Sequence, residues 1–274
     1  MRFVLTSAAC IGLAVSGCVP LLAQMQNNTE KQMTCSNGGN DRDRARYCEI
    51  REQSVASIGR LNIDASPNGG VTVKGWLRGD VLVRARVEAS GETEGAAANM
   101  ASRVMIDSSG GQVRATGPES ANNSWWSVGY EIFVPQLTDV TLKSNNGGLT
   151  ISDVRGQIHF DAVNGGVRLK RVAGEVSGAT VNGGIDVELA GAMADWRQME
   201  LKTNNGGVTV AMPAHYSARV QAETGMGRIQ SDFPLPPNAD GRGGRMDFNI
   251  GSGGPPIHIT TGNGGIRLKR VESQ

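Results

Sequence analysis

The sequence contains few aromatic residues and few histidines. Phenylalanine, tryptophan and tyrosine make up 4% of the 274 residues, and there are three histidines. The formal net charge at pH 7 is +1, so the whole chain has no strong field that would attract nucleic acid. Any partner must therefore be recognised by a local surface. The scarcity of aromatic residues indicates a core of small aliphatic side chains.

Residues 1 to 23 predict an export signal. Arg2 precedes an apolar stretch that ends near Gly17, and this stretch is too short and too rich in small residues for a convincing membrane span. Two processing sites remain open. Cleavage follows Ala23, or a lipobox ends at Cys18, which would then carry a lipid. We therefore expect a periplasmic, outer-membrane or cell-surface protein that contacts the membrane only through a lipid on Cys18.

Cysteine is also scarce, and two of the four cysteines lie in the export signal. The remaining pair, Cys35 and Cys48, predicts a disulfide, because an isolated pair in an exported protein is most simply oxidised. Closing this loop would contribute about 3 kcal/mol in the chain-entropy model. The flanking residues contain no histidine, so a metal site is not expected. We expect residues 24 to 55 to form a poorly ordered polar tether that carries the disulfide.

Glycine, by contrast, is abundant, with 38 residues, and much of it recurs in one motif. Asn-Gly-Gly begins at Asn68, Asn146, Asn164, Asn182, Asn205 and Asn263, with a degenerate copy at Met226. The three central copies are 18 residues apart. A regular period with insertions is typical of a solenoid, so we predict a short β-helix, or β-solenoid, with about 18 residues per coil.

Each copy has the same pattern of apolar residues. Aliphatic residues follow the asparagine at the third and fifth positions, as in Val167 and Leu169, with a polar residue between them. A second alternating segment precedes each asparagine. This pattern predicts two half-buried strands per copy. We expect the turn to have a positive φ angle, and its asparagines to hydrogen-bond along the stack.

The predicted folded domain covers residues 56 to 274, with N-terminal strands and a helix over 56 to 139 and repeat coils over 140 to 271. Strands are expected over 79 to 88, 111 to 116 and 126 to 134. A helix of about twelve residues is expected between 90 and 104, capped by Ser90. Proline and glycine between 233 and 254 indicate an excursion from the repeat. The fold class is mainly β, with one small helix.

Several segments resemble the DUF4097 family of putative adhesins. They are RYCEIRE at 46 to 52, DASPNGGVTVKGW at 64 to 76, the serial VNGGV-type turns, and GSGGPPIHITTGNGGIRL at 251 to 268. The resemblance covers most of the mature chain. It implies a β-helical exported domain and supplies no catalytic residues.

The residues give little indication of catalysis. His159 and His258 lie at outward positions, and Asp161 and Asp186 fall in different columns, so no acid pair is evident. There is no Ser/His/Asp or cysteine nucleophile signature, and no phosphate-binding loop. We expect no cofactor and no metal. A β-helical polysaccharide lyase or hydrolase stays as the enzymatic alternative.

Two groups of residues are candidates for a ligand surface. The first is the repeated RLKR run, which contains Arg168, Lys170, Arg171, Arg267, Lys269 and Arg270. The two runs are far apart in the repeat, which favours solvated corners over one continuous patch. The second is Trp125 with Phe133, which would face away from the core residues of their strand. They could stack on sugar or pack beneath the helix, and packing is favoured.

Together these observations predict a non-catalytic cell-envelope protein that is adhesin-like or structural. It would bind an envelope protein or a polysaccharide through its outer strand faces and loops. A module for envelope stress or regulation is the alternative among binding functions.

Overall fold

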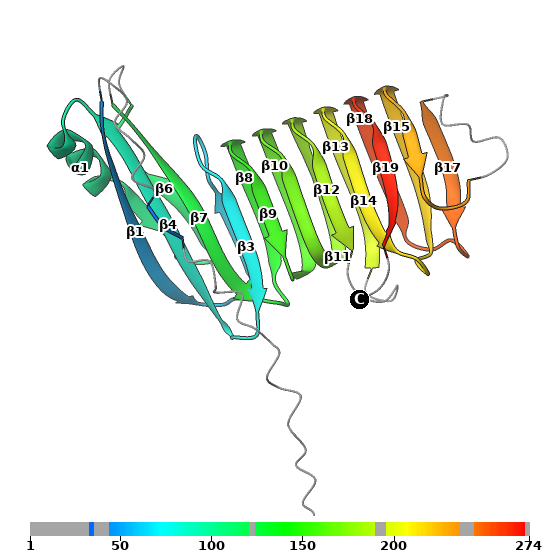
Figure 1. Cartoon of the computed structure of the whole chain (residues 1–274). Coiled ribbons are helices and arrows are strands. Elements are labelled where there is room, and N and C mark those ends of the chain that lie inside the picture. The colour runs from blue at the N-terminus through cyan, green and yellow to red at the C-terminus, as the bar shows by residue number, and fades with distance from the viewer. Residues whose placement is uncertain (1–32, 36–43, 121–123, 190–195, 236–243, 272–274) are drawn as a thin grey trace, which may run out of the picture. The chain divides into compact units, whose positions relative to one another are not determined.

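The alternating sequence folds into a mainly β protein, which we describe from a computed structural model. The structure describes residues 33–35, 44–120, 124–189, 196–235 and 244–271. In these residues the chain forms nineteen strands and one helix (Figure 1). The strands lie in two rows, and β11 contributes its first half to one row and its second half to the other.

The first row contains, in spatial order, β1 (Ala45–Ala56), β4 (Asp80–Gly91), β7 (Trp125–Pro135), β3 (Val71–Trp76), β9 (Leu149–Ser152), β11 (Val167–Asn182), β12 (Ile185–Leu189), β14 (Val208–Pro213), β19 (Ile266–Val271) and β16 (Ile229–Ser231). The second row contains β5 (Met105–Asp107), β6 (Gln112–Thr116), β2 (Arg60–Asp64), β8 (Asp139–Asn146), β10 (Arg155–Asn164), β11, β13 (Trp196–Asn205), β18 (Pro256–Asn263), β15 (Ala218–Met226) and β17 (Arg245–Ile250).

The central strands of both rows pair in parallel, with equivalent residues of each copy opposite one another. Val167 of β11, for example, lies opposite Leu149 on one side and Ile185 on the other. Each copy gives one strand to each row, with its Asn-Gly-Gly turn between them. Antiparallel pairing occurs only toward the ends of the described rows, where β1 pairs with β4, β4 with β7, β5 with β6, and β17 with β15.

The core lies between the two rows and consists of the aliphatic columns that the sequence predicts. The aliphatic residues at the third and fifth positions after the asparagine are at most 2% exposed in the six stacked Asn-Gly-Gly copies. The segments before the turns bury Val140, Leu142, Ile158, Phe160, Ile257 and Ile259 in the same way. Because every second residue is buried, the alternating pattern is satisfied on both sides of the turn.

The spatial order of the copies differs from their order in the sequence. Asn205 is paired with Asn263, and Asn263 is paired with Met226. The C-terminal strands β18 and β19 therefore lie between the copy that contains Asn205 and the degenerate copy that contains Met226. The segment between the strands of this degenerate copy and β18 includes β17, which forms the edge of the second row beside β15.

The first glycine of each turn is required by close backbone packing. A Cβ atom on Gly165 would lie 2.1 Å from the carbonyl oxygen of Gly147, and one on Gly183 would lie 2.1 Å from that of Gly165. The positive φ angle that we expected at the turn does not explain why glycine is required there. None of the turn asparagines has a positive φ, and Gly147 and Gly206 are nearly extended at 158° and 159°. Adjacent turns thus approach too closely for any side chain at this position.

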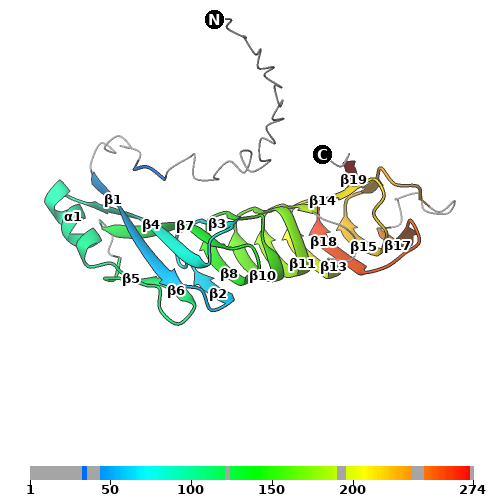
Figure 2. The same cartoon turned by 90° about the horizontal axis from the view of Figure 1, so that it is seen from below.

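Helix α1 (Glu94–Ser102) is shorter than expected and begins later. Its N-cap is Thr93, whose side-chain oxygen accepts a hydrogen bond from the Ala96 N–H, whereas the predicted cap, Ser90, is the buried penultimate residue of β4. The helix packs on β4 and β1, and Figure 2 shows it at the opposite end of the rows from β17. No helix in the described part of the chain is long and apolar enough to cross a membrane.

Residues 45 to 55 do not belong to a tether, contrary to expectation. They form most of β1, which pairs with β4 over twelve residues from Ala45–Gly91 to Ala56–Asp80. Arg51 fixes this strand to the helix, because its guanidinium donates to the carbonyl oxygens of Ala101 (2.9 Å) and Val104. The segment is therefore an edge strand, and charged side chains are typical of such strands. The predicted export signal lies outside the described residues.

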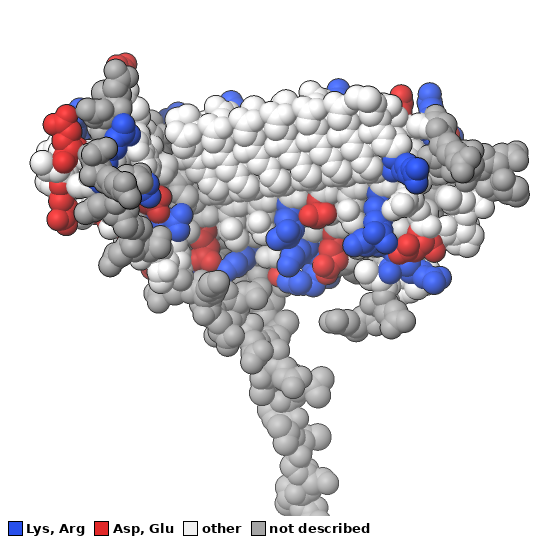
Figure 3. Space-filling model, turned by 45° about the horizontal axis from the view of Figure 1, so that its top comes forward, with Lys and Arg blue, Asp and Glu red and all other residues white. Residues whose placement is uncertain are grey.

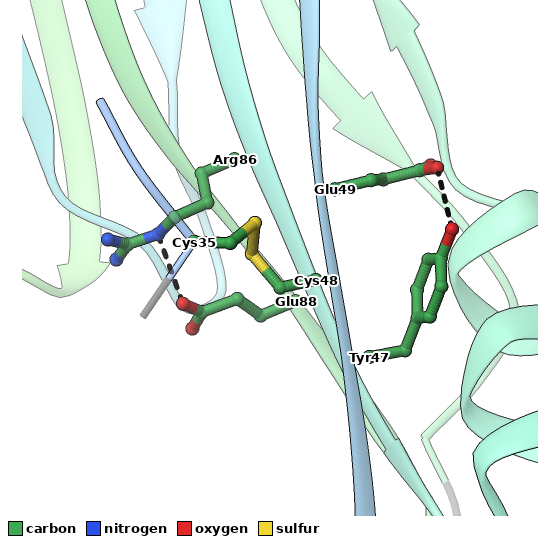
Figure 4. The surroundings of a disulfide bond; sticks show 6 residues. All are labelled: Cys35, Tyr47, Cys48, Glu49, Arg86 and Glu88. Carbon is green, nitrogen blue, oxygen red and sulfur yellow. Dashed lines mark hydrogen bonds and ion pairs between the residues drawn. A yellow bond between two sulfur atoms is a disulfide. The ribbon is translucent and has the colours of Figure 1, made fainter. Parts of the chain in front are cut away.

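The predicted disulfide between Cys35 and Cys48 is confirmed. Cys48 lies on β1, and the bond connects this strand to residues 33–35 (Figure 4). Beside it, Arg86 Nε of β4 is 3.0 Å from Glu88 Oε1, while the Tyr47 hydroxyl points away from the disulfide toward Glu49. The disulfide thus attaches residues 33–35 to the edge of the first row.

Two alanine substitutions in one turn test the packing requirement. Gly165→Ala should lower the free energy of unfolding by about 3 kcal/mol, because its methyl group overlaps a neighbouring carbonyl. Gly166→Ala should cost less than about 1 kcal/mol, since its Cβ would lie 3.6 Å from Gly184 O, an ordinary contact. Urea unfolding measures both. Equal losses for the two variants would contradict the packing argument.

Reduction of the disulfide should lower the free energy of unfolding by about 3 kcal/mol, because it releases a loop closed across a separation of 13 residues. Cys35→Ser should show the same loss without reductant, and no further loss with it. Chemical denaturation with and without dithiothreitol makes the comparison. An unchanged midpoint for the reduced wild-type protein would show that the attachment does not stabilise β1.

Candidate binding surface

The two RLKR runs lie on the outer side of the same row, on β11 and β19, but they are not adjacent. The register runs from Arg168 through Asp186 and Thr209 to Arg267. Three strand spacings correspond to about 14 Å. Asp186 also interrupts the positive charge, because its carboxylate is 4.0 Å from the Arg168 guanidinium. The two runs are therefore separate groups of cations.

Arg171 is held by an acidic partner. Its Nε and one terminal nitrogen each lie 2.7 Å from the carboxylate oxygens of Asp153, one position along the repeat. These hydrogen bonds raise the pKa of Arg171. Arg171 also has a positive φ of 49°, at the point where the pairing of β11 with β12 shifts register. The residue thus anchors a bulge at the corner of the repeat.

The other cations of the runs have neighbours of different kinds. Lys170 lies opposite Glu188, and the backbone N–H of Arg270 donates to Asp232. Lys269 lies opposite Ala211 and is partly buried. Arg168 and Arg171 have the acidic partners Asp186 and Asp153, so the runs do not form a continuous positive patch.

Phe133 does not belong to an exposed ligand surface. It is 1% exposed, and its ring stacks on Trp76 with 5.3 Å between centroids. The favoured position beneath the helix is also wrong for this residue, because Trp76, Lys74 and Arg84 cover the ring. Trp125 is partly buried, with the guanidinium of Arg46 6.0 Å from its ring centroid. The two aromatic side chains therefore do not form one platform.

Glu131 neutralises the cations that lie over Phe133. Its carboxylate is 2.7 Å from Lys74 Nζ and 3.3 Å from an Arg84 nitrogen, and its side chain is 8% exposed. Arg84 also contacts Glu52, whose side chain is 46% exposed, at 2.6 Å. A buried carboxylate between two cations stabilises this arrangement only while both partners remain. The group is therefore part of the packing on the outer side of β3, β4 and β7.

His159 has partners that the sequence did not predict. Its Nδ1 is 3.0 Å from the Ser177 hydroxyl on the next strand, and its Nε2 is 3.2 Å from Asp161 Oδ2. His159 and Ser177 are 18 residues apart, which is the repeat period. This interval is the signal in the sequence from which their contact could have been predicted. Serine, histidine and aspartate are the residue types of serine hydrolases. Here the histidine and aspartate side chains are 48% and 63% exposed, so water competes for both.

His258 is not part of this group. It lies opposite Glu200 on β13 and Gln221 on β15, three strands from His159 in the register. In the described part of the chain, no three His, Cys, Asp or Glu side chains gather closely enough to hold a metal ion.

The asparagines of the turns form a continuous ladder of side-chain hydrogen bonds. Each side-chain NH2 group donates to the amide oxygen of the neighbouring asparagine, through Asn146–Asn68, Asn164–Asn146, Asn182–Asn164, Asn205–Asn182 and Asn263–Asn205, at 2.8 to 3.0 Å. Stacking of the asparagines, one of the sequence predictions, is therefore observed. An ordered amide is present at every step of the ladder.

Buried hydroxyl groups form a second ladder beneath the first. The hydroxyls of Ser144, Thr180, Thr203, Thr224 and Thr261 each donate to the carbonyl oxygen of the first glycine in an adjacent turn, at 2.8 to 3.1 Å. Ala162 occupies the same position in the copy that contains Asn164. Ser66 occupies it in the copy that contains Asn68, where its hydroxyl makes no hydrogen bond to the described residues. The carbonyl groups of these turns are thereby satisfied inside the fold.

The stacked turns form a uniform surface, which we call the turn face. It comprises the Asn-Gly-Gly turns from residue 68 to residue 265 and the residues that directly precede the four central asparagines, Asn145, Val163, Val181 and Asn204. Figure 3 shows a broad surface without charged residues along the rows, bordered by a band of charged side chains. Val163 and Val181 are 40% and 39% exposed. A shallow groove lies at its border, lined by Gly148, Gly166 and Gly184 with Thr150, Arg168 and Asp186.

Substitution of Glu131 tests the packing over Phe133. Glu131→Gln should lower the free energy of unfolding by about 3 kcal/mol, because Lys74 and Arg84 lose their buried counter-charge. Glu52→Gln removes an exposed partner of the same arginine and should cost less than about 1 kcal/mol. Denaturant unfolding of both variants provides the comparison. A larger loss for Glu52→Gln would show that the buried carboxylate is not the main partner.

Comparison with known proteins gives distant structural similarity. No family model and no curated protein matches the sequence. A putative cell adhesion protein from Clostridium sporogenes is 15% identical, with a TM-score of 0.40 over 82% of this chain and 100% of that one. A putative adhesin from Bacteroides fragilis is 12% identical, with a TM-score of 0.29 over 81% and 97%. A putative lipid binding protein from Parabacteroides distasonis is 11% identical, with a TM-score of 0.31 over 81% and 96%. These values do not show membership of a family.

Proposed function

We propose that the protein is an exported, non-catalytic component of the bacterial cell envelope, adhesin-like or structural in role, which binds polysaccharide or protein through its outer surfaces. The parallel stacking of the repeat carries this proposal, because it places equivalent outward residues in long columns at a fixed spacing. We classify this architecture as a short β-solenoid with Asn-Gly-Gly turns, and we place the chain with the DUF4097 adhesin-like proteins that its motifs resemble.

Two observations support export. The Cys35–Cys48 bond is of the kind that persists in oxidising compartments outside the cytoplasm. The N-terminal sequence has the arrangement of an export signal. A lipid on Cys18 and a free terminus after Ala23 are both consistent with this location.

The outer surfaces favour binding over chemistry. The outward positions of the repeat vary between cations, acids and polar residues, while the buried inward positions stay apolar. Extended periodic surfaces can make repeated contacts along a polymer or a large partner. Once the first contact has formed, each further contact adds binding energy with little additional loss of entropy.

A second candidate function is hydrolysis of a polysaccharide or ester. The contacts of His159 with Ser177 and Asp161 favour it, because they bring a hydroxyl, an imidazole and a carboxylate within reach of one another. Binding is preferred since solvent exposure of the carboxylate and imidazole weakens their hold on the hydroxyl.

A glycan array combined with a hydrolysis screen separates the two candidates. The purified protein should retain one or more glycans and release no reducing sugar or ester product above the blank. Asp161→Asn and Ser177→Ala should leave binding unchanged. Turnover that is lost in either variant would overturn the non-catalytic proposal in favour of the hydrolase.

A further inference from the structure

The structure assigns the turn face as the binding surface for an uncharged linear polysaccharide lying along the ladder of asparagines. This inference rests on the proposed binding function and specifies both the surface and the ligand class. Four properties of the turn face carry it: its charge, its unused hydrogen-bonding groups, its exposed apolar side chains and its rigidity.

The charge of the turn face excludes a strongly charged partner. Asparagine and glycine make up all six stacked turns, and the residues directly before the central asparagines are Asn145, Val163, Val181 and Asn204. The charged band lies beside this surface (Figure 3). A polyanion on the turn face would lose water without gaining a counter-charge, whereas a neutral chain of hydroxyl groups has a much smaller desolvation cost.

The turn face retains donors that a hydroxyl-rich chain can use. An asparagine side chain has two N–H donors, and the ladder uses one of them in Asn164, Asn182 and Asn205. The backbone N–H groups of the second glycines, including Gly166 and Gly184, donate to no group among the described residues. These exposed glycines line the groove at the border of the turn face. Ring and hydroxyl oxygens of a glycan would satisfy donors of this kind.

The turn face also offers apolar contact and regular spacing. Val163 and Val181 are adjacent in the register and expose about two-fifths of their surface, which fits the C–H faces of sugar rings. Equivalent groups recur about every 4.8 Å, the spacing between strands. A polymer that lies along the rows can therefore make similar contacts at each step, and weak contacts sum to useful affinity.

The rigidity of the turn face reduces the entropic cost of binding. Each interior asparagine is held from both sides by hydrogen bonds of 2.8 to 3.0 Å. The glycine backbone beneath is fixed by close packing and by the buried hydroxyl ladder. A surface that is ordered before binding loses less conformational entropy when the ligand binds.

Two pairs of lysine substitutions test the assignment with the full-length oxidised protein. Val163→Lys with Val181→Lys places two charges on the turn face. Thr141→Lys with Thr260→Lys places two charges at exposed positions on the second row, away from the turns. Both variants gain the same net charge, and thermal unfolding checks that each retains its fold.

Depletion isotherms with microcrystalline cellulose and chitin measure binding to neutral chains, and soluble alginate provides an anionic comparison. The wild-type protein should bind a neutral polymer with little dependence on salt. The valine pair should bind at least about ten-fold more weakly, because its charges are buried without partners, and the threonine pair should stay within about two-fold of wild type.

The other outcomes overturn the inference in distinguishable ways. Equal binding by wild type and both variants would assign the glycan to another surface and leave the proposed function intact. Salt-sensitive binding to alginate alone would identify an anionic ligand. A dimer in sedimentation velocity that only the valine pair abolishes would identify a second copy as the occupant. Absence of binding to cellulose and chitin would also overturn it, and glycan turnover would overturn the proposed function as well.

Discussion

The approach of one glycine backbone to the next is the constraint on which the structure depends. A Cβ atom on the first glycine of a turn would lie about 2 Å from the carbonyl oxygen of the adjacent turn. Since no side chain fits there, neighbouring turns superimpose closely, and the strands on either side remain in register. The aliphatic columns of both rows then align, so that Val167 covers Leu149 and is covered by Ile185. Turn packing and core packing are therefore satisfied together.

The same superposition creates the two ladders of the turns. When equivalent residues are stacked, each asparagine side chain donates a hydrogen bond to the next asparagine, and a threonine hydroxyl donates to a glycine carbonyl oxygen. On the outer sides of the rows, stacking instead brings unlike residues together, as with Arg168 beside Asp186 and His159 beside Ser177. One geometric rule thus gives a uniform turn face and varied strand faces, and the uniform one is the better candidate for recognising a repeating ligand.

The repeat was predictable from the sequence because its signals are local. The spacing of Asn164 and Asn182 and the alternation of Val167 and Leu169 fix the strands, the turns and the buried positions. Features that depend on tertiary pairing were not predictable. Residues 45 to 55 have a polar composition, and only their pairing with β4 makes them a strand. Phe133 occupies an outward position, and it is covered only by side chains from other strands, Trp76, Lys74 and Arg84. The partners of His159 follow from the repeat period once adjacent copies are superimposed.

The position of β18 and β19 affects how the fold can be assembled. The last copy in the sequence is an interior step of the rows, between β13 and β15 on one side and between β14 and β16 on the other. Synthesis from the N-terminus therefore delivers β15 and β16 before the strands that separate them from the rest of the structure. Their final pairing must wait for the C-terminal residues. Without residues 256 to 271 the rows would lack an interior step, so strands that come late in the sequence complete the inside of the stack.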